Sequence, residues 1–399
     1  MANQPTNSKH ILFLFSDTGG GHRSAAEAII EALQLEYGSR ITTELLDFIK
    51  TYAPPPLNQA PAWYPYMVRV PDLWGVNYQL SDGWRRTRAV LNIAYPYTYR
   101  SIKRMFQDHP SDLIVSVHPL GTSQVLRAMS KPRPLFVTVV TDLVTTHAFW
   151  YEPDADLCIV PTEGAKRRAV KYRVPESKIR VVGLPVADRF CQPVQDSRAL
   201  RQALGWPEDL PMTLLVGGGD GMGPLGKTAE AIAAARLPLG MAIVTGRNAK
   251  LKESLEARKW PVFTKVYGFV RNMPDMMQAA DILVTKAGPG TICEALNAGL
   301  PMILYSRLPG QEDGNISYVV QEGAGIWAPE PDQIVTAVRT WLEKPEQYAQ
   351  AEANCRRIAR PHAARHPLRR EDARSAYPAA RPRGRGRDAA RSGDRRARS

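Results

Sequence analysis

The chain has 399 residues, of which 44% are hydrophobic, so it is long and apolar enough to form two domains with buried cores. No apolar run reaches the roughly 18 residues of a membrane-spanning helix, and the polar start MANQPTNSKH is unlike a signal peptide. Four scattered cysteines without a C-x-x-C pair argue against a zinc site or a disulfide framework and favour a reducing, cytoplasmic compartment.

The net charge of +13 is concentrated near the C-terminus. From Arg356 to Ser399 the chain has 15 Arg, no Lys and 4 acidic residues, a net charge of +11, which leaves only +2 for the other 355 residues. The body of the protein is therefore nearly neutral, and we expect no nucleic-acid partner for it. We expect residues 346–399 to form a disordered, Arg-rich tail. The tail is either an RNA- or lipid-binding arm or the product of a frame change in a GC-rich coding sequence. The absence of Lys beside 15 Arg favours the frame change, because Arg codons are GC-rich.

An apolar run, Ile11–Ser16, predicts a buried strand at the start of the first domain. A glycine turn (residues 17–22, DTGGGH) and a helical pattern over Arg23–Tyr37 follow, as at the opening of a doubly wound sheet. The glycines do not form G-x-G-x-x-G, so the dinucleotide fingerprint is absent. His22 lies in the first turn of the predicted helix, whose dipole favours a neutral imidazole. We therefore predict that His22 is a general base or a substrate contact, the alternative being a simple helix-start residue.

Residues 52–105 have a different composition. Between Tyr52 and Tyr99 lie 10 of the 23 Trp and Tyr residues of the chain, interleaved with Arg and Lys. Trp and Tyr favour the membrane–water boundary, and cationic side chains favour anionic lipid head groups. We predict an insertion that docks on a membrane and admits a lipid. The alternatives are an aromatic satellite core under long loops and, less favoured, a surface that stacks single-stranded nucleic acid.

Further strand-like segments, mostly separated by helical patterns, predict a mainly parallel sheet over the first domain, residues 1–185. Asp142 follows the strand Leu135–Thr141, and His147 lies close behind it, so both are candidates for acceptor contact or base chemistry. Asp154 and Asp156 match a D-x-D metal motif, but they precede a strand instead of ending one. We interpret that match as chance.

Residues 186–210 are rich in Pro and charge and predict a linker, after which a second series of strands extends over residues 211–345. Each of these strands ends in small residues, as a nucleotide cleft requires. Residues 221–228 (GMGPLGKT) also match G-x-x-x-x-G-K-[ST]. A true phosphate-binding loop of that kind follows its strand directly, whereas here residues 217–220 intervene. Pro224 would also remove a phosphate-binding N–H. We therefore do not expect an ATP-binding loop.

The segment 285–294 (TKAGPGTICE) follows a buried strand and begins a helix. Gly288 and Gly290 allow a ligand to approach the backbone closely, and Pro289 suits a first helical turn. The unpaired N–H groups of that turn favour a diphosphate. Glu294, one turn further on, is placed to accept hydrogen bonds from a ribose diol. An ordinary strand–helix connection is the alternative.

Seven segments together resemble the monogalactosyldiacylglycerol synthases and the bacterial processive diacylglycerol glucosyltransferases, from about residue 10 to 345. They are GGGH (19–22), residues 141–156, GGGDGMG (217–223), GRN (246–248), GFV (268–270), AGPGTICEA (287–295) and PGQEDGN (309–315). The resemblance implies the GT-B fold of glycosyltransferase family 28, an α/β architecture of two Rossmann-like, doubly wound parallel-sheet domains that face a cleft. The first domain would bind the lipid acceptor and the second a UDP-sugar.

The resemblance also implies roles for individual residues. His22 would be the catalytic base, with Asp142 as second choice, and Gly20, Gly21 and His147 would contact the acceptor. Phe269 and Val270 would frame the uracil, and Glu294 would bind the ribose. The other expected UDP-sugar contacts are Gly217, Gly218, Gly219, Gly221, Gly223, Gly246, Arg247, Gly288, Pro289, Gly290, Thr291, Gln311, Glu312 and Asn315.

The implied reaction is an inverting transfer of a hexose to the free hydroxyl of diacylglycerol, without a metal or other cofactor. UDP-galactose and UDP-glucose are both possible donors. The enzyme would be peripheral on the inner, cytoplasmic face of an anionic membrane. Rival interpretations are a murein-type transferase acting on a polyprenyl-diphosphate sugar, and a non-catalytic membrane- or RNA-associated protein. The family usually ends in a helix that crosses back to the first domain, where this chain has its Arg-rich segment, so we expect interdomain closure to be weakened.

Overall fold

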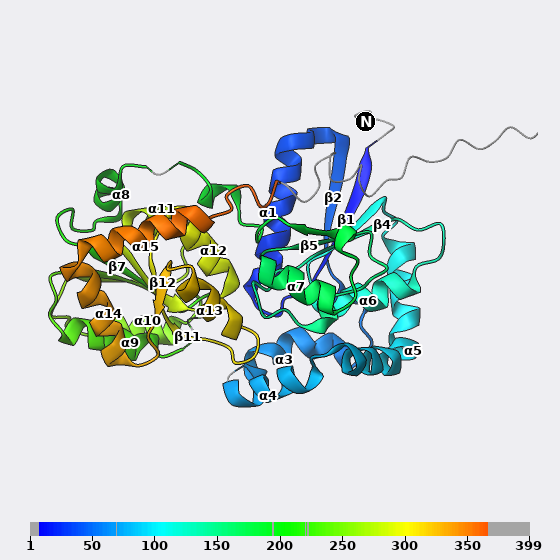
Figure 1. The fold of residues 1–399 in the computed structure, drawn as a ribbon, viewed down its shortest axis with the longest axis horizontal. Helices are drawn as coiled ribbons and strands as arrows, with labels where there is room; N and C mark the ends of the chain where they lie inside the picture. Colours follow the sequence, from blue (N-terminus) through cyan, green and yellow to red (C-terminus); the bar gives the residue numbers. More distant parts are fainter. Residues whose placement is uncertain (1–7, 69, 194, 220, 222, 366–399) are drawn as a thin grey trace, which may run out of the picture.

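The computed structural model describes residues 8–68, 70–193, 195–219, 221 and 223–365. They form two α/β domains side by side, each built on a six-stranded parallel sheet with helices on both faces (Figure 1). The expectation of two Rossmann-like domains is therefore confirmed. The predicted Arg-rich tail beyond Arg365 lies outside the described residues.

The first sheet has the strand order β2-β1-β3-β4-β5-β6. Leu12, Phe13 and Leu14 of β1 are fully buried, because helices cover both faces of a parallel sheet. The strand order reverses beside β1, and this is where ligands bind in such sheets. The strands are β1 (Lys9–Phe15), β2 (Ile41–Asp47), β3 (Leu113–Ser116), β4 (Leu135–Val139), β5 (Leu157–Val160) and β6 (Ile179–Val181). The helices around them are α1 (Gly20–Tyr37), α2 (Phe48–Tyr52), α6 (Pro119–Ala128) and α7 (Glu163–Lys171).

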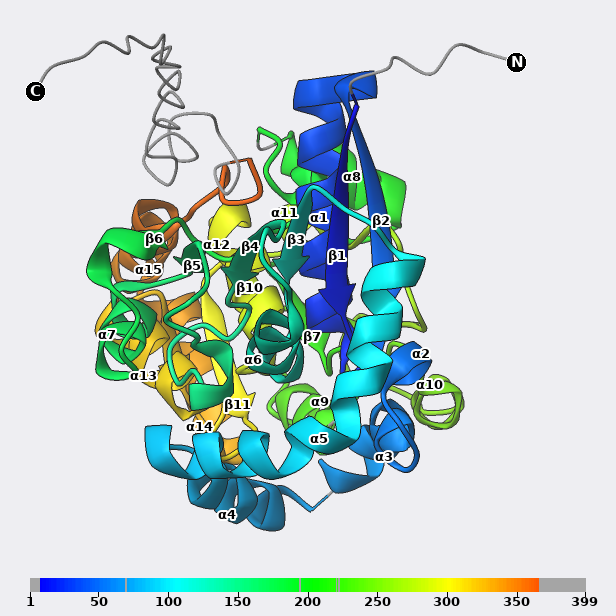
Figure 2. The same cartoon turned by 90° about the vertical axis from the view of Figure 1, so that its right-hand side faces the viewer.

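The insertion consists of three helices at one end of the molecule, α3 (Ala60–Met67), α4 (Pro71–Ser81) and α5 (Trp84–Asp108) (Figure 2). Some of its aromatic side chains pack inward: the rings of Tyr64 and Trp74 meet edge to face, with centroids 5.5 Å apart. Arg88 anchors α5 to the first domain through two 2.8 Å hydrogen bonds to the buried Glu152 carboxylate. The insertion is therefore a helical layer and not a set of long loops.

The second sheet has the order β12-β11-β10-β7-β8-β9, again parallel, and it reverses between β7 and β10. Its strands are β7 (Met212–Val216), β8 (Gly240–Val244), β9 (Thr264–Tyr267), β10 (Ile282–Lys286), β11 (Met302–Ser306) and β12 (Gly325–Trp327). The helices are α9 (Leu225–Ala234), α10 (Ala249–Glu256), α11 (Met273–Ala279), α12 (Pro289–Ala298), α13 (Asp313–Gln321) and α14 (Pro331–Glu343).

The segment expected to be a linker, residues 186–210, is partly folded. It contains helix α8 (Ser197–Leu204), whose Arg201 side chain is buried and donates to the Ala279 carbonyl oxygen at 2.8 Å and to Asp281 at 2.6 Å. These contacts attach α8 to the second domain. The connection between the domains is therefore shorter than the sequence pattern indicated.

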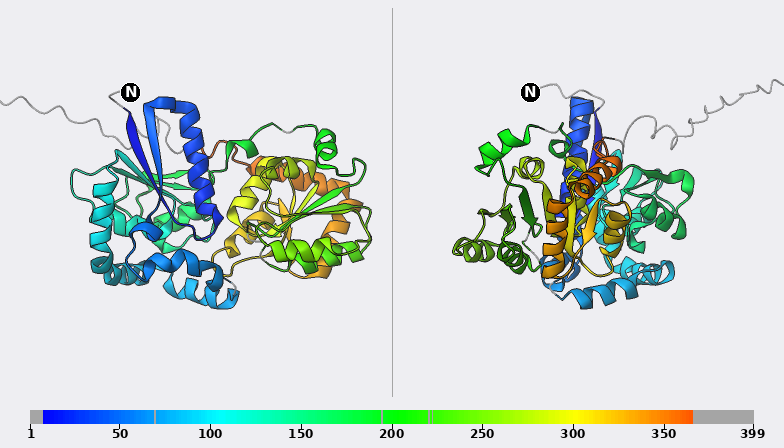
Figure 3. Two further views of the ribbon diagram at one scale, coloured as in Figure 1. Left: turned by 180° about the vertical axis from the view of Figure 1, so that it is seen from behind. Right: turned by 60° about the vertical axis from the view of Figure 1, so that its left-hand side comes forward.

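The chain beyond residue 345 also differs from the expectation of a disordered tail from residue 346. Residues Pro345–Ile358 form helix α15, whose buried Cys355 and Ile358 belong to the core of the second domain. Residues 359–365 then return to the first domain, where Ala364 packs on Ala28 and Ala32 of α1 (Figure 3). Small apolar residues between the arginines make this packing possible, and the described chain does brace one domain against the other.

Among the described residues, no helix combines the length and apolar character that crossing a bilayer requires.

The returning segment gives a testable prediction at Gly183. A Cβ atom there would lie 2.6 Å from Cβ of Arg360, and Gly183 has φ of +111°. Gly38 has φ of +54° but open space around its Cβ position, so it controls for backbone strain alone. We expect Gly183→Ala to lower the free energy of unfolding by about 1–3 kcal/mol more than Gly38→Ala, because it also displaces the returning segment. Equal losses in denaturant titrations would show that this segment is not packed on Gly183.

Candidate active site

The residues predicted to carry chemistry in the first domain follow the carboxyl ends of three adjacent strands. His22 comes after β1, His118 after β3, and Thr141 and Asp142 after β4. Because parallel strands end at the same edge of the sheet, these side chains converge at the point where the strand order reverses.

His22 is held in one orientation. Its Nδ1 lies 3.0 Å from the carbonyl oxygen of Val117 and 2.7 Å from Oγ1 of Thr141. A carbonyl oxygen only accepts, so Nδ1 carries the proton and Nε2 keeps its lone pair. Burial lowers the pKa of His22 below its ordinary value, against a smaller opposing effect of Asp142. His22 is therefore a neutral imidazole with one basic nitrogen, which is the form a general base needs.

Asp142 is buried beside this histidine and accepts hydrogen bonds from both domains. Oδ2 accepts from the indole N–H of Trp150 at 2.6 Å, and Oδ1 accepts from the amide of Gln311 in the second domain at 3.0 Å. Burial is the main influence on this carboxyl and raises its pKa. Trp150 also contacts the His22 ring, with ring centroids 5.9 Å apart. Asp142 is thus placed to stabilise a proton gained by His22.

His118 completes this cluster and was not identified from the sequence. Its ring lies edge-on to His22, with centroids 4.7 Å apart, and its Nε2 is 2.8 Å from Oγ1 of Thr18 in the glycine turn. Nδ1 accepts a hydrogen bond from the Leu120 N–H. Nε2 therefore carries the ring proton and donates a hydrogen bond to the Thr18 hydroxyl oxygen. Burial, reinforced by His22, holds the pKa of His118 well below its ordinary value. The signal available in the sequence was a histidine directly after a buried strand.

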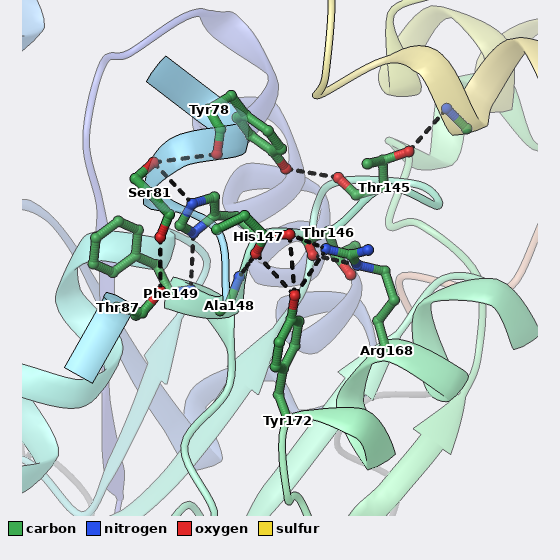
Figure 4. Close-up of polar contacts among 12 residues, drawn as sticks. Tyr78, Ser81, Thr87, Thr145, Thr146, His147, Ala148, Phe149, Arg168 and Tyr172 are labelled. Carbon is green, nitrogen blue, oxygen red and sulfur yellow. Dashed lines mark hydrogen bonds and ion pairs between the residues drawn. The ribbon is translucent and has the colours of Figure 1, made fainter. Parts of the chain in front are cut away.

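His147, predicted to contact the acceptor, lies in a dense polar network (Figure 4). Its Nδ1 accepts from the Phe149 N–H at 3.1 Å, and its Nε2 is 3.1 Å from the Ser81 hydroxyl on α4. Burial lowers its pKa to about 4. Both ring nitrogens thus have protein partners, and a direct contact with the acceptor stays a prediction that would require one of these partners to leave.

The same network joins three parts of the molecule. The Tyr78 hydroxyl on α4 donates to the carbonyl oxygen of Thr145, and the Thr145 hydroxyl accepts from the Gly314 N–H in the second domain. A Cβ atom on Gly75 of α4 would lie 2.8 Å from the Pro309 side chain. Helix α4 therefore packs against the loop 309–315, which runs into the first turn of α13 and contains several of the predicted sugar contacts.

In the second domain the predicted glycine loops pack backbone to backbone. A Cβ atom on Gly221 would lie 2.3 Å from the Thr245 carbonyl oxygen, and one on Gly246 would lie 2.3 Å from that of Gly219. The Arg247 N–H donates to the same Gly219 oxygen at 2.9 Å. Only glycine fits at Gly221 and Gly246, which also have φ near +60°. These residues are required by the loop packing itself, whatever they bind.

The turn between β10 and α12 meets the loop 309–315. The Lys286 ammonium lies 2.8 Å from Oε1 of the buried Glu312, and Asn315 donates from its amide to the Ala287 carbonyl oxygen at 2.9 Å. Glu312 also accepts from the Leu308 N–H at 2.7 Å. Glu312 and Asn315 were predicted sugar contacts, whereas Lys286 was missed, although it precedes the predicted phosphate turn directly.

Other predicted residues lie around the same edge of the second sheet. Phe269 is exposed, with the Arg247 guanidinium 5.1 Å from its ring centroid, and Val270 packs partly into the domain core. Gly290 in the first turn of α12 has open space where a side chain would extend. Gly20 and Gly21 have the same open space at the first-domain edge. Pro289 and Thr291 are half-buried beside Gly290.

Two sequence matches are explained by local structure. Asp156 of the D-x-D match is bound by the Arg133 guanidinium at 2.6 Å and by the Phe136 N–H at 2.7 Å. Thr228 of the P-loop match is buried inside α9, so its hydroxyl does not face a ligand. In the described part of the chain, no three His, Cys, Asp or Glu side chains form a group that would hold a metal ion.

The fold has clear structural relatives. MurG from Acinetobacter baumannii superposes with a TM-score of 0.60 at 16% identity, covering 90% of this chain and 97% of that one. Anabaena HepE in complex with UDP-glucose superposes with a TM-score of 0.54 at 15% identity, covering 92% and 99%. With two Rossmann-like domains, each built on a parallel sheet, the protein has the GT-B fold.

Sequence comparison identifies the family. A family model described as Monogalactosyldiacylglycerol (MGDG) synthase matches residues 22–186, and one described as Glycosyltransferase family 28 C-terminal domain matches residues 213–365. Monogalactosyldiacylglycerol synthase 2, chloroplastic, of Arabidopsis thaliana is 39% identical over 89% of this chain and 79% of its own length. A probable synthase 2 of Oryza sativa subsp. japonica is 40% identical, over 84% and 74%. The chain belongs to the monogalactosyldiacylglycerol synthase family.

Glu294 gives a prediction for the nucleotide site. Burial raises the pKa of this carboxyl to about 7, so in the free protein it becomes protonated as the pH falls below 7. Two hydrogen bonds from a ribose diol favour the ionised form. We therefore expect the affinity for uridine to decrease as the pH is lowered from 7.5 to 5.5. Uridine is the suitable probe because, unlike UDP, it has no group that titrates in this range.

The matched variant is Glu294→Gln, which cannot ionise. It should bind uridine more weakly at pH 7.5, by about 10-fold or more, and with little dependence on pH. A pH dependence of uridine affinity that is the same in both proteins, measured by NMR titration, would remove Glu294 from the ribose site.

Proposed function

We propose that the protein transfers a galactosyl group from UDP-galactose to the free hydroxyl of 1,2-diacylglycerol, with inversion, to give a β-monogalactosyldiacylglycerol. The observation that carries the proposal is His22, a neutral histidine with a free Nε2 at the reversal point of the first sheet. Gln311 links the same cluster to the second domain through Asp142. The family membership supplies the substrate class, because the named relatives are monogalactosyldiacylglycerol synthases.

In this mechanism Nε2 of His22 removes the proton of the diacylglycerol hydroxyl as its oxygen attacks the anomeric carbon. The bond between that carbon and the UDP oxygen breaks, and the electron pair leaves with UDP. Asp142 then stabilises the imidazolium. Because the pKa of His22 is lowered, the base form persists at neutral pH and somewhat below it.

The second domain would hold the donor. Backbone groups of Gly217–Gly219 and of residues 246–248 would lie close to the ligand, and the first turn of α12 (Pro289–Ala298) would offer its N–H groups to the diphosphate. Phe269 and Val270 would contact uracil and Glu294 the ribose. Gln311, Glu312 and Asn315 would lie near the sugar.

The acceptor would arrive from a membrane beneath the insertion. Leu73, Val76 and Leu80 of α4 are exposed at i, i+3 and i+7 spacing, so they form one apolar helix face. Helix α5 repeats this spacing with exposed side chains at Val90, Ile93 and Tyr97. Such faces are suited to the lipid interface.

Helix α5 also has four exposed basic side chains. They are Arg85, Arg86, Arg100 and Arg104. Each contributes about 1 kcal/mol of attraction near an anionic surface. We therefore propose peripheral binding to an anionic membrane. The cytoplasmic face remains the predicted location, whereas the named plant relatives are chloroplastic.

The function is tested by incubating the full chain with diacylglycerol vesicles and labelled UDP-galactose or UDP-glucose, and separating the lipids by chromatography. We expect a galactolipid from UDP-galactose and much less product from UDP-glucose. Preference for UDP-glucose would correct the donor. Transfer only to a polyprenyl-diphosphate sugar would favour the murein-type reaction, and no transfer at all would favour a binding protein.

For His22→Ala we expect a loss of turnover of about 10²-fold or more, because the other candidate base, Asp142, already accepts hydrogen bonds from Trp150 and Gln311. UDP affinity should stay within about twofold, since the nucleotide binds the other domain. Turnover is measured with the transfer assay, and UDP affinity is measured by calorimetry. Turnover equal to that of the wild type would exclude His22 as the base.

For membrane binding we compare Leu73→Asp with Leu35→Asp. Both leucines are 67% exposed, but Leu35 lies on α1, away from the insertion. Loss of one leucine from the proposed lipid contact, together with the added negative charge, should weaken binding to anionic vesicles at least about 10-fold for Leu73→Asp only. Co-sedimentation measures this binding, and equal effects of the two substitutions would place the docking surface elsewhere.

A further inference from the structure

Lys286 is the last residue of β10 and stands at the turn that leads into α12. Its side chain is 22% exposed, and its ammonium forms an ion pair with Glu312, whose side chain is only 4% exposed. A half-buried lysine at the carboxyl end of a strand, beside the reversal point of the sheet, lies where ligands bind in this class of fold.

Two glycine loops approach this side chain from different directions. A Cβ atom on Gly218 would lie 3.3 Å from Cε of Lys286, and a Cβ atom on Gly288 would lie 3.1 Å from its Nζ. The ammonium is therefore between the loop that follows β7 and the loop that follows β10. A Cβ atom at Gly218 or Gly288 would be in tight contact with the lysine side chain, which would have to shift.

Two buried polar atoms nearby have no hydrogen-bond partner within the described ranges. They are Oδ1 of Asn315 and the hydroxyl of Tyr305, on side chains that are 1% and 2% exposed. The amide of Asn315 is fixed to the Ala287 carbonyl, one residue from Lys286, and the Tyr305 hydroxyl lies 3.6 Å from the Cβ position of Gly223. Leaving such groups unpaired is costly, which favours a ligand that donates to the Asn315 oxygen and forms a hydrogen bond with the Tyr305 hydroxyl.

We propose that Lys286 binds the diphosphate of the nucleotide sugar and stabilises UDP as it leaves; this rests on the function proposed above. When the bond from the anomeric carbon to the phosphate oxygen breaks, the electron pair stays on that oxygen and its negative charge increases. A cation fixed beside it in a half-buried site lowers the energy of that charge more than water would. The acceptor oxygen forms the new bond, and its proton goes to Nε2 of His22.

Glu312 is the positioning residue for this lysine. Its two carboxylate oxygens are occupied by Lys286 and by the Leu308 N–H, so its side chain is held in one place. This arrangement keeps the ammonium in position before the donor binds. It also gives Glu312 a role distinct from a direct contact with a sugar hydroxyl.

The test compares Lys286→Met with Lys166→Met, because Lys166 makes an ion pair of similar length, 2.7 Å, with the exposed Glu176 in the first domain. Calorimetry with UDP, and NMR titration with uridine, separate the diphosphate from the rest of the nucleotide. We expect Lys286→Met to weaken UDP binding about 10- to 100-fold and uridine binding no more than about twofold. Lys166→Met should change neither, and Lys286→Arg should retain most UDP affinity.

Turnover supplies the second readout. With UDP-galactose at saturating concentration, Lys286→Met should reduce kcat by about 10²-fold, with a thermal unfolding midpoint close to that of Lys286→Arg. Unchanged UDP affinity, or equal losses for UDP and uridine, would overturn the role of Lys286.

The outcomes separate this inference from the proposed function. If the wild type binds UDP, Lys286→Met loses that affinity selectively and no galactolipid forms, the diphosphate role stands and the reaction is wrong. If galactolipid forms and Lys286→Met binds UDP normally, the reaction stands and the role of Lys286 is wrong. A wild type that does not bind UDP would overturn both.

Discussion

A hydrogen bond between two side chains joins the two halves of this molecule at the place where chemistry is expected. The Gln311 amide of the second domain donates to Asp142, which is buried in the first domain beside His22. The bond depends on the returning segment after α15 and on the loop that carries Thr145, because both hold the domains together. Donor and acceptor chemistry are therefore connected through one carboxylate.

The two domains contribute groups of different charge to this contact. The first domain contributes neutral histidines and a carboxyl whose pKa burial raises. The second contributes the ion pair of Lys286 and Glu312 and the first turn of α12. A proton acceptor thus stands on one side and electropositive groups on the other. That is the separation which an inverting displacement with a diphosphate leaving group requires.

Much of the fold followed from local sequence. Short apolar runs ending in glycine turns predicted the strands, the two-domain division, the position of His22 and the turn between β10 and α12. His118 and Trp150 were missed because their proximity to His22 depends on strand order and on a loop that folds back, which local patterns do not encode. Helix α15 was missed because its buried positions, Ala351, Cys355 and Ile358, are few and stand among mostly polar residues.

The insertion shows a similar limit. Its aromatic and basic composition indicated an interfacial segment, but composition does not say which side chains turn inward. Tyr64, Trp74 and Tyr78 pack within the protein, whereas aliphatic residues such as Leu73 and Ile93 form much of the exposed apolar surface. Some aromatic residues are therefore the scaffold of this surface, whereas others, such as Tyr66 and Tyr97, are exposed on it. The helical spacing of the aliphatic residues became informative only once the helices were placed.

Helix α4 has only 11 residues, and it presents Leu73, Val76 and Leu80 on one side and Gly75 against Pro309 on another. On the proposed docking, one short rigid body would therefore rest on the lipid and support the loop that carries Gln311. The depth of that helix in the bilayer would set the height of the sugar above the headgroup plane. The distance that a diacylglycerol hydroxyl must move out of the membrane to meet the sugar would then be set by the rigid protein and not by a flexible arm.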